Sequence, residues 1–328
     1  MFLVRSPLRI SLGGGGTDLP SYYRKKGGYL IAGAINKYVY TAAIKPFNKG
    51  IFLKYSEIEN VNHIDQIKHK IFKEILSMRE IEDENLQIEL TTLADIPAGT
   101  GLGSSGAFTV STLRAIEVFF SEFSTSENLA KQASHIEIER LKEPVGKQDQ
   151  YISALGGLSE FTFHKDDTVE YNRLPISEDI FFKLEDSILL FFTGYSRSAS
   201  SILVTQDNQS NESDENMIAN LDSVKEMGLI SRELLINGDI NQYGLLMQDH
   251  WNKKLKRSPD MCPPQIKKYF DIGLANGAIG AKLIGAGGGG FIMFIADDKN
   301  QLRKVMTENG LKELRFKFDQ IGVHVLQH

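Results

Sequence analysis

A glycine-rich stretch with two serines has the composition of an anion-binding turn. It runs from Pro97 to Ala107 and reads Pro-Ala-Gly-Thr-Gly-Leu-Gly-Ser-Ser-Gly-Ala. Glycines let the backbone adopt positive φ and approach a ligand closely, and the unpaired N–H groups at the start of a helix attract anions. The serine hydroxyl groups suit a phosphate oxygen or a magnesium ion. The stretch therefore predicts a phosphate-binding turn, and the alternative is a tight turn with serine caps.

Two other phosphate-binding motifs fit this stretch less well. The Walker loop needs a lysine after its glycines, and no lysine lies between Pro97 and Leu113. Residues 101–106 match the dinucleotide pattern Gly-x-Gly-x-x-Gly, which also needs an acidic residue about 20 positions later, at the end of a second strand. Glu117 and Glu122 lie instead in or just after a segment expected to be helical. The dinucleotide interpretation is therefore weak.

Three further segments have the residue types of a binding or catalytic site. Gly13 to Gly16 precede Asp18 and place bare backbone beside a carboxylate, which suggests close approach by a ligand. Asp149 follows Pro-Val-Gly-Lys-Gln and precedes an apolar segment. A carboxylate placed in this way can act as a base, because the cation keeps it ionised while burial raises its basicity; the alternative is a turn aspartate. Residues 285–290 read Gly-Ala-Gly-Gly-Gly-Gly between two strand-like segments.

Taken in order, these segments resemble the motifs of the GHMP kinases, the family of galactokinase, homoserine kinase, mevalonate kinase and phosphomevalonate kinase. The stretch that begins at Pro97 resembles the family's phosphate loop. The segment that contains Asp149 resembles its Gly-x-x-Asp-Gln element, and residues 285–290 resemble its third motif. The resemblance spans nearly the whole chain. It implies an enzyme that transfers a phosphoryl group from ATP, with Mg²⁺, to a hydroxyl group of a small molecule.

The same resemblance implies roles for individual residues. Asp149 would accept the proton of the acceptor hydroxyl or orient it, and Arg9 would keep Asp149 ionised or stabilise the transferring phosphoryl group. Ser105 and Glu139 would bind Mg²⁺, with Glu137 as the rival because helical spacing places it nearer an apolar stripe. The residues expected to bind the nucleotide are Pro97, Gly99, Gly101, Leu102, Gly103, Ser104, Ser105 and Gly106. The residues expected to bind the substrate are Gly15, Gly16, Asp18, Arg197, Gly287 and Gly288.

Details of the motifs narrow the choice of the small molecule that accepts the phosphoryl group. Asp18 matches the family's sugar-binding Thr-Asp, so a contact with a sugar hydroxyl is expected. Galactose itself is not expected, because Gly15 and Gly16 replace the Glu and His of the galactokinase form. Residues 5–18, the Gly-Lys-Gln-Asp-Gln-Tyr segment and His-Trp-x-x-Lys at 250–254 resemble the family members that act on D-glycero-D-manno-heptose 7-phosphate. Those enzymes phosphorylate the anomeric oxygen and give a 1,7-bisphosphate on the route to nucleotide-activated heptose. The cations that could hold the substrate phosphate are Arg24, Lys25, Arg197 and Lys254.

Two alternatives to a heptose phosphate kinase stay open. The chain could be another sugar kinase of the family, similar to a fucokinase or galactokinase. It could instead be a non-catalytic sensor of sugar and ATP on the same fold. A panel of sugar substrates would distinguish a heptose phosphate kinase from another sugar kinase. An ATPase assay in the presence of sugar would distinguish an enzyme from a sensor.

The elements that must position these motifs predict an α+β fold in two parts. Strands are expected at 2–12, 29–32, 38–44, 51–55 and 86–93, and helices at 63–78, 108–120, 127–141, 216–236, 239–256 and 263–276. Residues 206–216 are expected to form a polar loop. Polarity rises near 176–186, which divides the chain into an ATP-binding part, 1–182, and a second part, 183–328. The resemblance implies a ribosomal protein S5 domain 2-like N-terminal half and a ferredoxin-like C-terminal half.

Bulk composition excludes several other classes of protein. The 328 residues are 41% hydrophobic and carry a net charge of −5, which argues against nucleic acid as a partner. Cys262 is the only cysteine, so no intrachain disulfide or cysteine-rich metal site can form. No apolar run approaches membrane-spanning length, and the apolar run at the start is too short for a signal peptide. We therefore expect a cytoplasmic enzyme with a small sugar phosphate as its substrate and no membrane partner; oligomeric state stays open.

Overall fold

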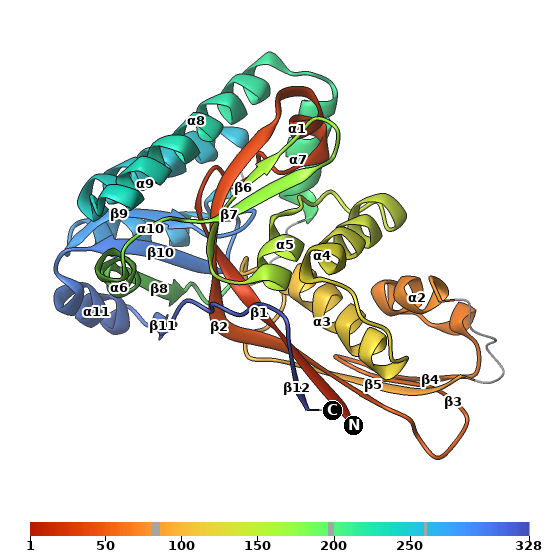
Figure 1. Ribbon diagram of the computed structural model, residues 1–328. Helices are drawn as coiled ribbons and strands as arrows, with labels where there is room; N and C mark the ends of the chain where they lie inside the picture. Colours follow the sequence, from red (N-terminus) through yellow and green to blue (C-terminus); the bar gives the residue numbers. More distant parts are fainter. Residues whose placement is uncertain (80–85, 196–199, 259–260, 328) are drawn as a thin grey trace.

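The computed structural model describes residues 1–79, 86–195, 200–258 and 261–327. Its strands form two sheets, and α-helices pack on both of them (Figure 1). This combination of separate sheets and packed helices confirms the predicted α+β class. The two chain ends lie side by side at one end of the larger sheet (Figure 1).

The larger sheet belongs mainly to the first half of the chain, and its central strands run in the order β12-β1-β2-β5-β3-β4. Its strands are β1 (Phe2–Gly13), β2 (Gly28–Ile44), β3 (Gly50–Lys54), β4 (Ile58–Val61), β5 (Gln87–Ala94), β6 (Leu158–Phe163), β7 (Val169–Arg173) and β12 (His324–Gln327). The helices of this half are α1 (Pro20–Lys26), η1 (Ile64–Gln66), α2 (Lys70–Ser77), α3 (Ser104–Phe119), α4 (Ser126–Ser134), η3 (His135–Arg140) and α5 (Gln148–Leu155). Helices α3 and α5 pack against β1 and β2, so the helix that follows the glycine loop rests on the centre of the sheet.

The smaller sheet has the order β11-β8-β10-β9, and its pairs are antiparallel. Its strands are β8 (Ile188–Phe192), β9 (Ala278–Leu283), β10 (Phe291–Ala296) and β11 (Lys312–Leu314). The helices of this half are α6 (Glu178–Ser187), α7 (Ser200–Asn211), α8 (Glu215–Asn237), α9 (Ile240–Lys254), η4 (Leu255–Arg257), α10 (Pro264–Leu274) and α11 (Lys299–Glu308). Strand β9 packs against α9 and α10, and it leads directly into the third glycine motif.

One strand, β2, connects the whole of the larger sheet. Residues 28–33 pair with β6 and residues 39–44 pair with β5, while β1 pairs with β2 along nearly all of its length. Two separate strands were predicted here, at 29–32 and 38–44. The register between β1 and β2 shifts after Pro7. Proline has no N–H to donate to the ladder, and a register shift lets the strands continue past it.

The two halves share a hydrophobic core. Leu8 and Ile10 of β1 belong to the same buried cluster as Leu190 of β8 and Met293 of β10. A second cluster lies between the larger sheet and α3, α4 and α5. Buried apolar contacts therefore run across the junction between the two halves. The predicted division at residue 182 falls inside α6, whose first turn is capped by Ser177, and the division stays a prediction.

The predicted loop at 206–216 is wrong for its first part. Helix α7 continues to Asn211, and it buries Gln206 and Ser210 four residues apart against the rest of the protein. Polar composition suggested a loop, but the buried Gln206 amide has partners: it donates to the Gly16 carbonyl and accepts from Arg257. A buried polar side chain with satisfied hydrogen bonds is compatible with a packed helix.

The helix predicted at 127–141 has two parts. Helix α4 is followed by a π-helical turn, η3, in which the Leu141 N–H donates to the carbonyl of Ile136, five residues earlier. Such wider turns occur frequently at functional sites because they alter which side chains face inward. In this protein the turn contains both Glu137 and Glu139, the two candidate metal ligands.

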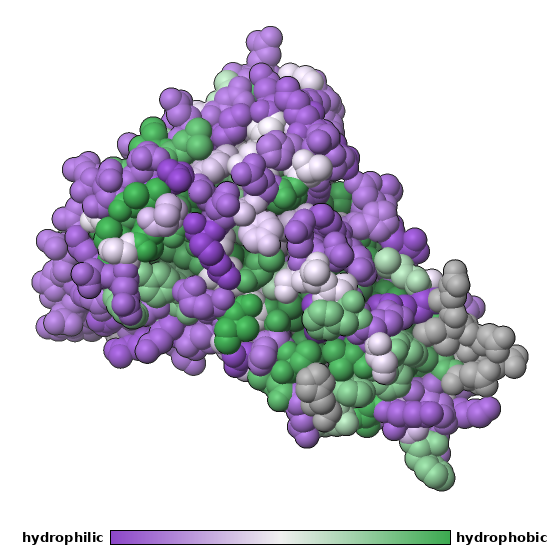
Figure 2. Space-filling model, in the orientation of Figure 1, coloured by the Kyte–Doolittle hydropathy of each residue, from purple (hydrophilic) through white to green (hydrophobic). Residues whose placement is uncertain are grey.

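The surface is largely hydrophilic on the face shown in Figure 2, and apolar side chains gather on its lower central part, over the sheet near β12. Phe47 and Phe123 are among the exposed aromatic side chains. Within the described residues, no helix combines the length and apolar character needed to cross a membrane.

Candidate active site

The glycine loop leads from β5 into α3 with the backbone that the sequence predicts. Gly99, Gly101 and Gly103 all have φ between +76° and +83°, a region that side chains rarely adopt. Gly103 immediately precedes α3, and no side chain caps this helix start. The loop and the first residues of α3 line a cavity of about 1100 Å³. The first N–H groups of α3 therefore lie beside a cavity large enough for a nucleotide.

Three predicted nucleotide-binding residues shape the loop instead of lining this cavity. The Pro97 carbonyl accepts a hydrogen bond from Thr100, which closes a turn. Leu102 is fully buried in the core between the halves. A Cβ on Gly106 would lie 2.6 Å from the Cβ of Asp149, so glycine is required for α3 and α5 to approach. The remaining five, namely Gly99, Gly101, Gly103, Ser104 and Ser105, line the cavity.

The third glycine motif packs against the phosphate loop, backbone to backbone. A Cβ on Gly285 would lie 2.5 Å from the Cα of Gly101, and one on Gly101 would overlap the Ile284 carbonyl. A Cβ on Gly290 would overlap the Thr100 carbonyl. Side chains at these positions would push the two loops apart. The glycines thus hold two distant parts of the chain at one place.

Arg9 and Asp149 form a bidentate ion pair at the mouth of this loop. Arg9 Nε donates to Asp149 Oδ1 at 2.7 Å, and Arg9 Nη2 donates to Oδ2 at 3.0 Å. Arg9 Nη1 also donates to the Gly101 carbonyl, which fixes the pair against the phosphate loop. Both side chains line the large cavity and also a smaller, adjacent pocket. The carboxylate is therefore held in place at the boundary between the two cavities.

The structure corrects the choice of Glu139 as the partner of Ser105. Ser105 Oγ donates to Glu137 Oε2 at 2.7 Å, and Glu137 is buried beside the phosphate loop. Glu139 instead forms a partly exposed ion pair with Arg24, at 2.7 Å. The physical reason is helical phase: Glu137 follows the buried Ala133 by four residues and faces inward, while Glu139 faces outward.

The residues around Ser105 fit a magnesium ion that also binds nucleotide phosphates. Ser104 Oγ and Glu137 Oε1 are buried, and neither has a hydrogen-bond partner among the described residues. Burial raises the pKa of Glu137, and a nearby cation would favour its ionised form. Mg²⁺ is commonly held by one or two carboxylates together with substrate phosphates. Among the described residues no three His, Cys, Asp or Glu side chains form a metal cluster, so phosphate oxygens would supply the other ligands.

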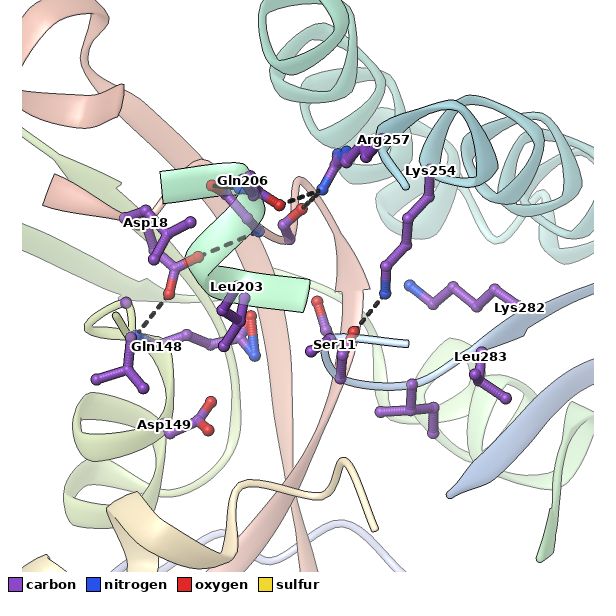
Figure 3. A pocket seen from close by; sticks show the side chains of 18 of the residues that line it. Ser11, Asp18, Gln148, Asp149, Leu203, Gln206, Lys254, Arg257, Lys282 and Leu283 are labelled. Carbon is purple, nitrogen blue, oxygen red and sulfur yellow. Dashed lines mark hydrogen bonds between the residues drawn. The ribbon is translucent and has the colours of Figure 1, made fainter. Parts of the chain in front are cut away.

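The smaller pocket has a volume of about 110 Å³ and is built around Asp18 (Figure 3). Asp18 Oδ1 accepts from the Gly16 N–H, and Oδ2 accepts from the Gln148 N–H, both at 3.1 Å. Burial raises the pKa of Asp18 above its usual range. Gly15 and Gly16 line the same pocket. The structure thus brings three predicted substrate-binding residues together, next to Asp149.

Two of the other three residues predicted to bind the substrate are described by the structure, and neither lines this pocket. Gly287 and Gly288 are absent from the lining of both cavities described above; they contact Met261, and the Gly288 N–H donates to its carbonyl at 2.9 Å. Their role is to shape the third motif, which corrects their assignment to the substrate. Arg197 lies outside the described residues.

Two of the proposed phosphate-binding cations lie away from the pocket. Arg24 pairs with Asp167 and Glu139, and Lys25 donates to the backbone carbonyls of Ser210 and Asn211. Lys254 does line the pocket.

Sequence reasoning missed several polar residues of the pocket. These are Ser11, Gln206, His250, Arg257 and Lys282. Lys282 could have been found from the sequence, because a lysine inside the apolar run of a largely buried strand is unusual. Trp251 stacks on Phe270 with ring centroids 5.0 Å apart and also reaches the pocket.

Comparison with known proteins agrees with this geometry. The model of the GHMP kinases N terminal domain matches residues 66–157, and that of the GHMP kinases C terminal domain matches residues 231–310. Together they cover more than half of the chain, which therefore belongs to the GHMP kinase family. It is an ATP-dependent sugar kinase.

Individual relatives point to sugars and sugar phosphates. The chain is 28% identical to a D-glycero-alpha-D-manno-heptose 7-phosphate kinase of Campylobacter jejuni, over 98% of this chain and 97% of that one. It is also 28% identical to an L-fucokinase/L-fucose-1-P guanylyltransferase of Bacteroides fragilis, over 93% of this chain but 36% of that one. A crystal structure of a D-glycero-D-manno-heptose 1-phosphate kinase from Bacteroides thetaiotaomicron superposes with a TM-score of 0.81, at 24% identity, over 100% of this chain and 99% of that one.

Proposed function

We propose that this protein transfers the terminal phosphoryl group of ATP to the anomeric hydroxyl of D-glycero-D-manno-heptose 7-phosphate. The product would be the 1,7-bisphosphate, a precursor of nucleotide-activated heptose. One observation carries the proposal: the Arg9–Asp149 pair lies where the nucleotide cavity meets the Asp18 pocket. A hydroxyl in the smaller pocket and a triphosphate in the larger one would meet at that carboxylate.

The residues of the chain divide the work of phosphoryl transfer. Asp149 accepts a hydrogen bond from the acceptor hydroxyl and orients it or takes its proton as the new bond forms. Arg9 holds Asp149 in place through its bidentate bond and adds positive charge beside the transferring group. Asp18 accepts a hydrogen bond from another sugar hydroxyl. Ser105 and Glu137 would hold Mg²⁺, which when bound neutralises charge between the transferred and leaving phosphates.

The choice of acceptor is supported by the chemistry of the pocket and by the Campylobacter relative. An anomeric hydroxyl is more acidic than an ordinary alcohol, so a single carboxylate is an adequate base. The pocket presents cations in addition to Asp18, as a sugar that already bears a phosphate requires. L-Fucose is the second candidate, because the Bacteroides fragilis relative is equally similar over most of this chain.

A product analysis tests the proposal. The protein, ATP and Mg²⁺ are incubated separately with heptose 7-phosphate, L-fucose and D-galactose, and ADP release is measured together with the mass and ³¹P spectrum of each product. We expect a bisphosphate whose new phosphorus couples to the anomeric proton. Transfer to fucose with no transfer to heptose 7-phosphate would favour the second candidate. Tight sugar and ATP binding with no phosphorylated product would favour a sensor. Cytoplasmic location stays a prediction from the sequence.

A further inference from the structure

We propose that the end of the sugar pocket formed by Ser11, His250, Lys254, Arg257 and Lys282 binds the phosphate group that the sugar already carries. The inference rests on the proposed function and goes beyond it by naming the residues that select a phosphorylated sugar. His250 and Lys254 come from the last turns of α9, Arg257 from η4, and Lys282 from β9. All five line the pocket that contains Asp18 and Asp149.

The first observation is an excess of positive charge. Arg9 is neutralised by its bidentate bond to Asp149, whereas Lys254, Arg257 and Lys282 form no ion pair with a carboxylate among the described residues. Lys254 donates to the Gly285 carbonyl and Arg257 to neutral oxygens of Asn220 and Gln206. The charge of Asp18 reaches Arg257, so the three basic groups outnumber the carboxylate near them. Buried basic groups without counter-charges are costly to ionise, so a pocket that keeps them is arranged for an anionic ligand.

The second observation is a set of buried polar atoms without partners. Arg257 Nη2, His250 Nε2 and Ser11 Oγ make no hydrogen bond among the described residues, and all three side chains are at least nine-tenths buried. Native proteins rarely bury polar groups in this way unless a ligand or water satisfies them. A phosphate has three oxygens that can each accept such bonds.

The third observation is the placement of this cluster relative to the reacting carboxylate. Figure 3 shows Asp149 on one side of the pocket and the amino groups of Lys254 and Lys282 on the other, pointing toward one another. The arrangement lets one small molecule present a hydroxyl group to Asp149 and an anionic group to the lysines. Because the basic residues of the cluster come from the second half of the chain, while Asp149 and Ser11 come from the first, the substrate would bridge both halves.

The electrostatic state of the cluster agrees with an anion site. Burial and the charge of Arg9 lower the pKa of Lys282 to about 7, and burial with neighbouring cations lowers the pKa of Lys254 well below its usual range. Burial likewise lowers the pKa of His250, which faces Lys282, Arg257 and Lys254. Each cation would regain its charge when a dianionic phosphate enters.

The test compares two forms of one sugar, with and without its phosphate. Lys282→Met keeps an unbranched side chain, one atom shorter, and removes its charge. Lys256→Met is the matched control, because Lys256 is exposed and does not line the pocket. We expect Lys282→Met to lower kcat/KM for heptose 7-phosphate by about 10- to 100-fold, the effect of losing one charged hydrogen bond. Its kcat/KM for the unphosphorylated heptose should change by less than about threefold, and Lys282→Arg should restore most of the preference for the phosphorylated sugar.

Two results would overturn the inference. One is an equal loss with both sugars, which would place Lys282 at the transferring phosphoryl group. The other is unchanged preference for heptose 7-phosphate in a folded Lys282→Met protein. Folding is checked by the melting temperature, which should rise in Lys282→Met because an uncompensated buried charge has been removed.

Failure of the proposed function remains distinguishable from failure of this inference. Inorganic phosphate serves as a probe that needs no turnover: it should raise the melting temperature of the wild-type protein and of Lys256→Met, but not that of Lys282→Met. If the wild-type enzyme uses only unphosphorylated sugars yet phosphate stabilises it through Lys282, the function is wrong and the anion site stands. Equal stabilisation of all three proteins by phosphate would contradict the site.

Discussion

The large cavity, proposed to bind the nucleotide, and the small pocket, proposed to bind the sugar, meet at Asp149 but are built by different physical means. The phosphate loop occupies one short stretch, 97–106, and works through backbone: glycines with positive φ and the free start of α3. The sugar pocket collects side chains from β1, α7, α9, η4 and β9, and its main property is buried charge. Substitutions in the first region should act through steric overlap. Substitutions in the second should act through electrostatics and therefore depend on pH.

The largest effect is expected at the residue that both regions share. Asp149→Asn should lower kcat by about 10³-fold, because the amide cannot take a proton and no longer pairs with Arg9. The KM for ATP should change little, since the phosphate loop is untouched. Steady-state kinetics with heptose 7-phosphate measures both parameters. Near-normal turnover by a folded Asp149→Asn protein would refute the assignment of Asp149.

Magnesium dependence should separate two neighbouring glutamates. Glu137→Gln should lower the apparent affinity for Mg²⁺ by about 10- to 100-fold, since it removes a buried carboxylate next to Ser105. Glu139→Gln is the control and should stay within about twofold, because that side chain is partly exposed and pairs with Arg24. Activity is titrated with Mg²⁺ at fixed ATP. A larger loss of Mg²⁺ affinity in Glu139→Gln than in Glu137→Gln would identify Glu139 as the metal ligand.

A steric effect should identify the backbone contact of the phosphate loop. Gly101→Ala places a methyl group against the Ile284 carbonyl and should raise the KM for ATP by about tenfold. Gly310→Ala is the control: its φ of +82° is similar, but a Cβ there meets nothing within 4 Å. Both variants should lose about 1 kcal/mol of stability from backbone strain alone. Equal KM values for the two variants would mean that the overlap at Gly101 relaxes freely.

The smallest expected effect is a change in the free energy of unfolding with pH, which should come from Lys282 in the small pocket. The folded protein holds the pKa of Lys282 at about 7, while the unfolded chain keeps the usual value of 10.5. Between these values the unfolded state binds the extra proton, so Lys282 makes stability rise as pH increases from 7 and destabilises the fold fully below it. From pH 7 to 8 the wild-type protein should gain about 1 kcal/mol relative to Lys282→Met.

Urea unfolding at the two pH values measures this double difference. Titrations elsewhere in the chain cancel because they occur in both proteins. Lys256→Met should follow the wild-type slope, since its side chain is exposed. Parallel slopes for the wild type and Lys282→Met would show that Lys282 keeps its charge in the folded protein.

The contrast between the two regions also explains which parts of the site could be predicted from the sequence. The phosphate-binding turn at 97–106 could be predicted from its own residues, because a run of glycines directly before a helix is typical of anion binding. Asp149 and Asp18 were found through neighbouring residues in the chain. Glu137 was named as the rival of Glu139 but not chosen, because its inward direction depends on tertiary contacts of η3. Arg257 was missed because nothing near it in the sequence indicates that η4 faces Gly16.

The fold was predictable to a similar degree. Strands and helices with clear periodicity were found near their observed bounds, including α8, α9 and α10. The part of α7 from Gln206 to Asn211 was predicted as a loop because it is polar, and the partners of its buried Gln206, namely Gly16 and Arg257, are distant in the sequence. A helix held by long-range hydrogen bonds leaves no periodic signal in its own residues.

The contact between Gly101 and Gly285 has a consequence for synthesis of the chain on the ribosome. The phosphate loop is made early, but the backbone that supports its outer side is made only when the third motif emerges, long after. A nascent chain that ends before Gly285 would therefore lack this support for the loop and should not retain nucleotide. ATP would begin to assist folding only once almost the entire polypeptide has left the exit tunnel.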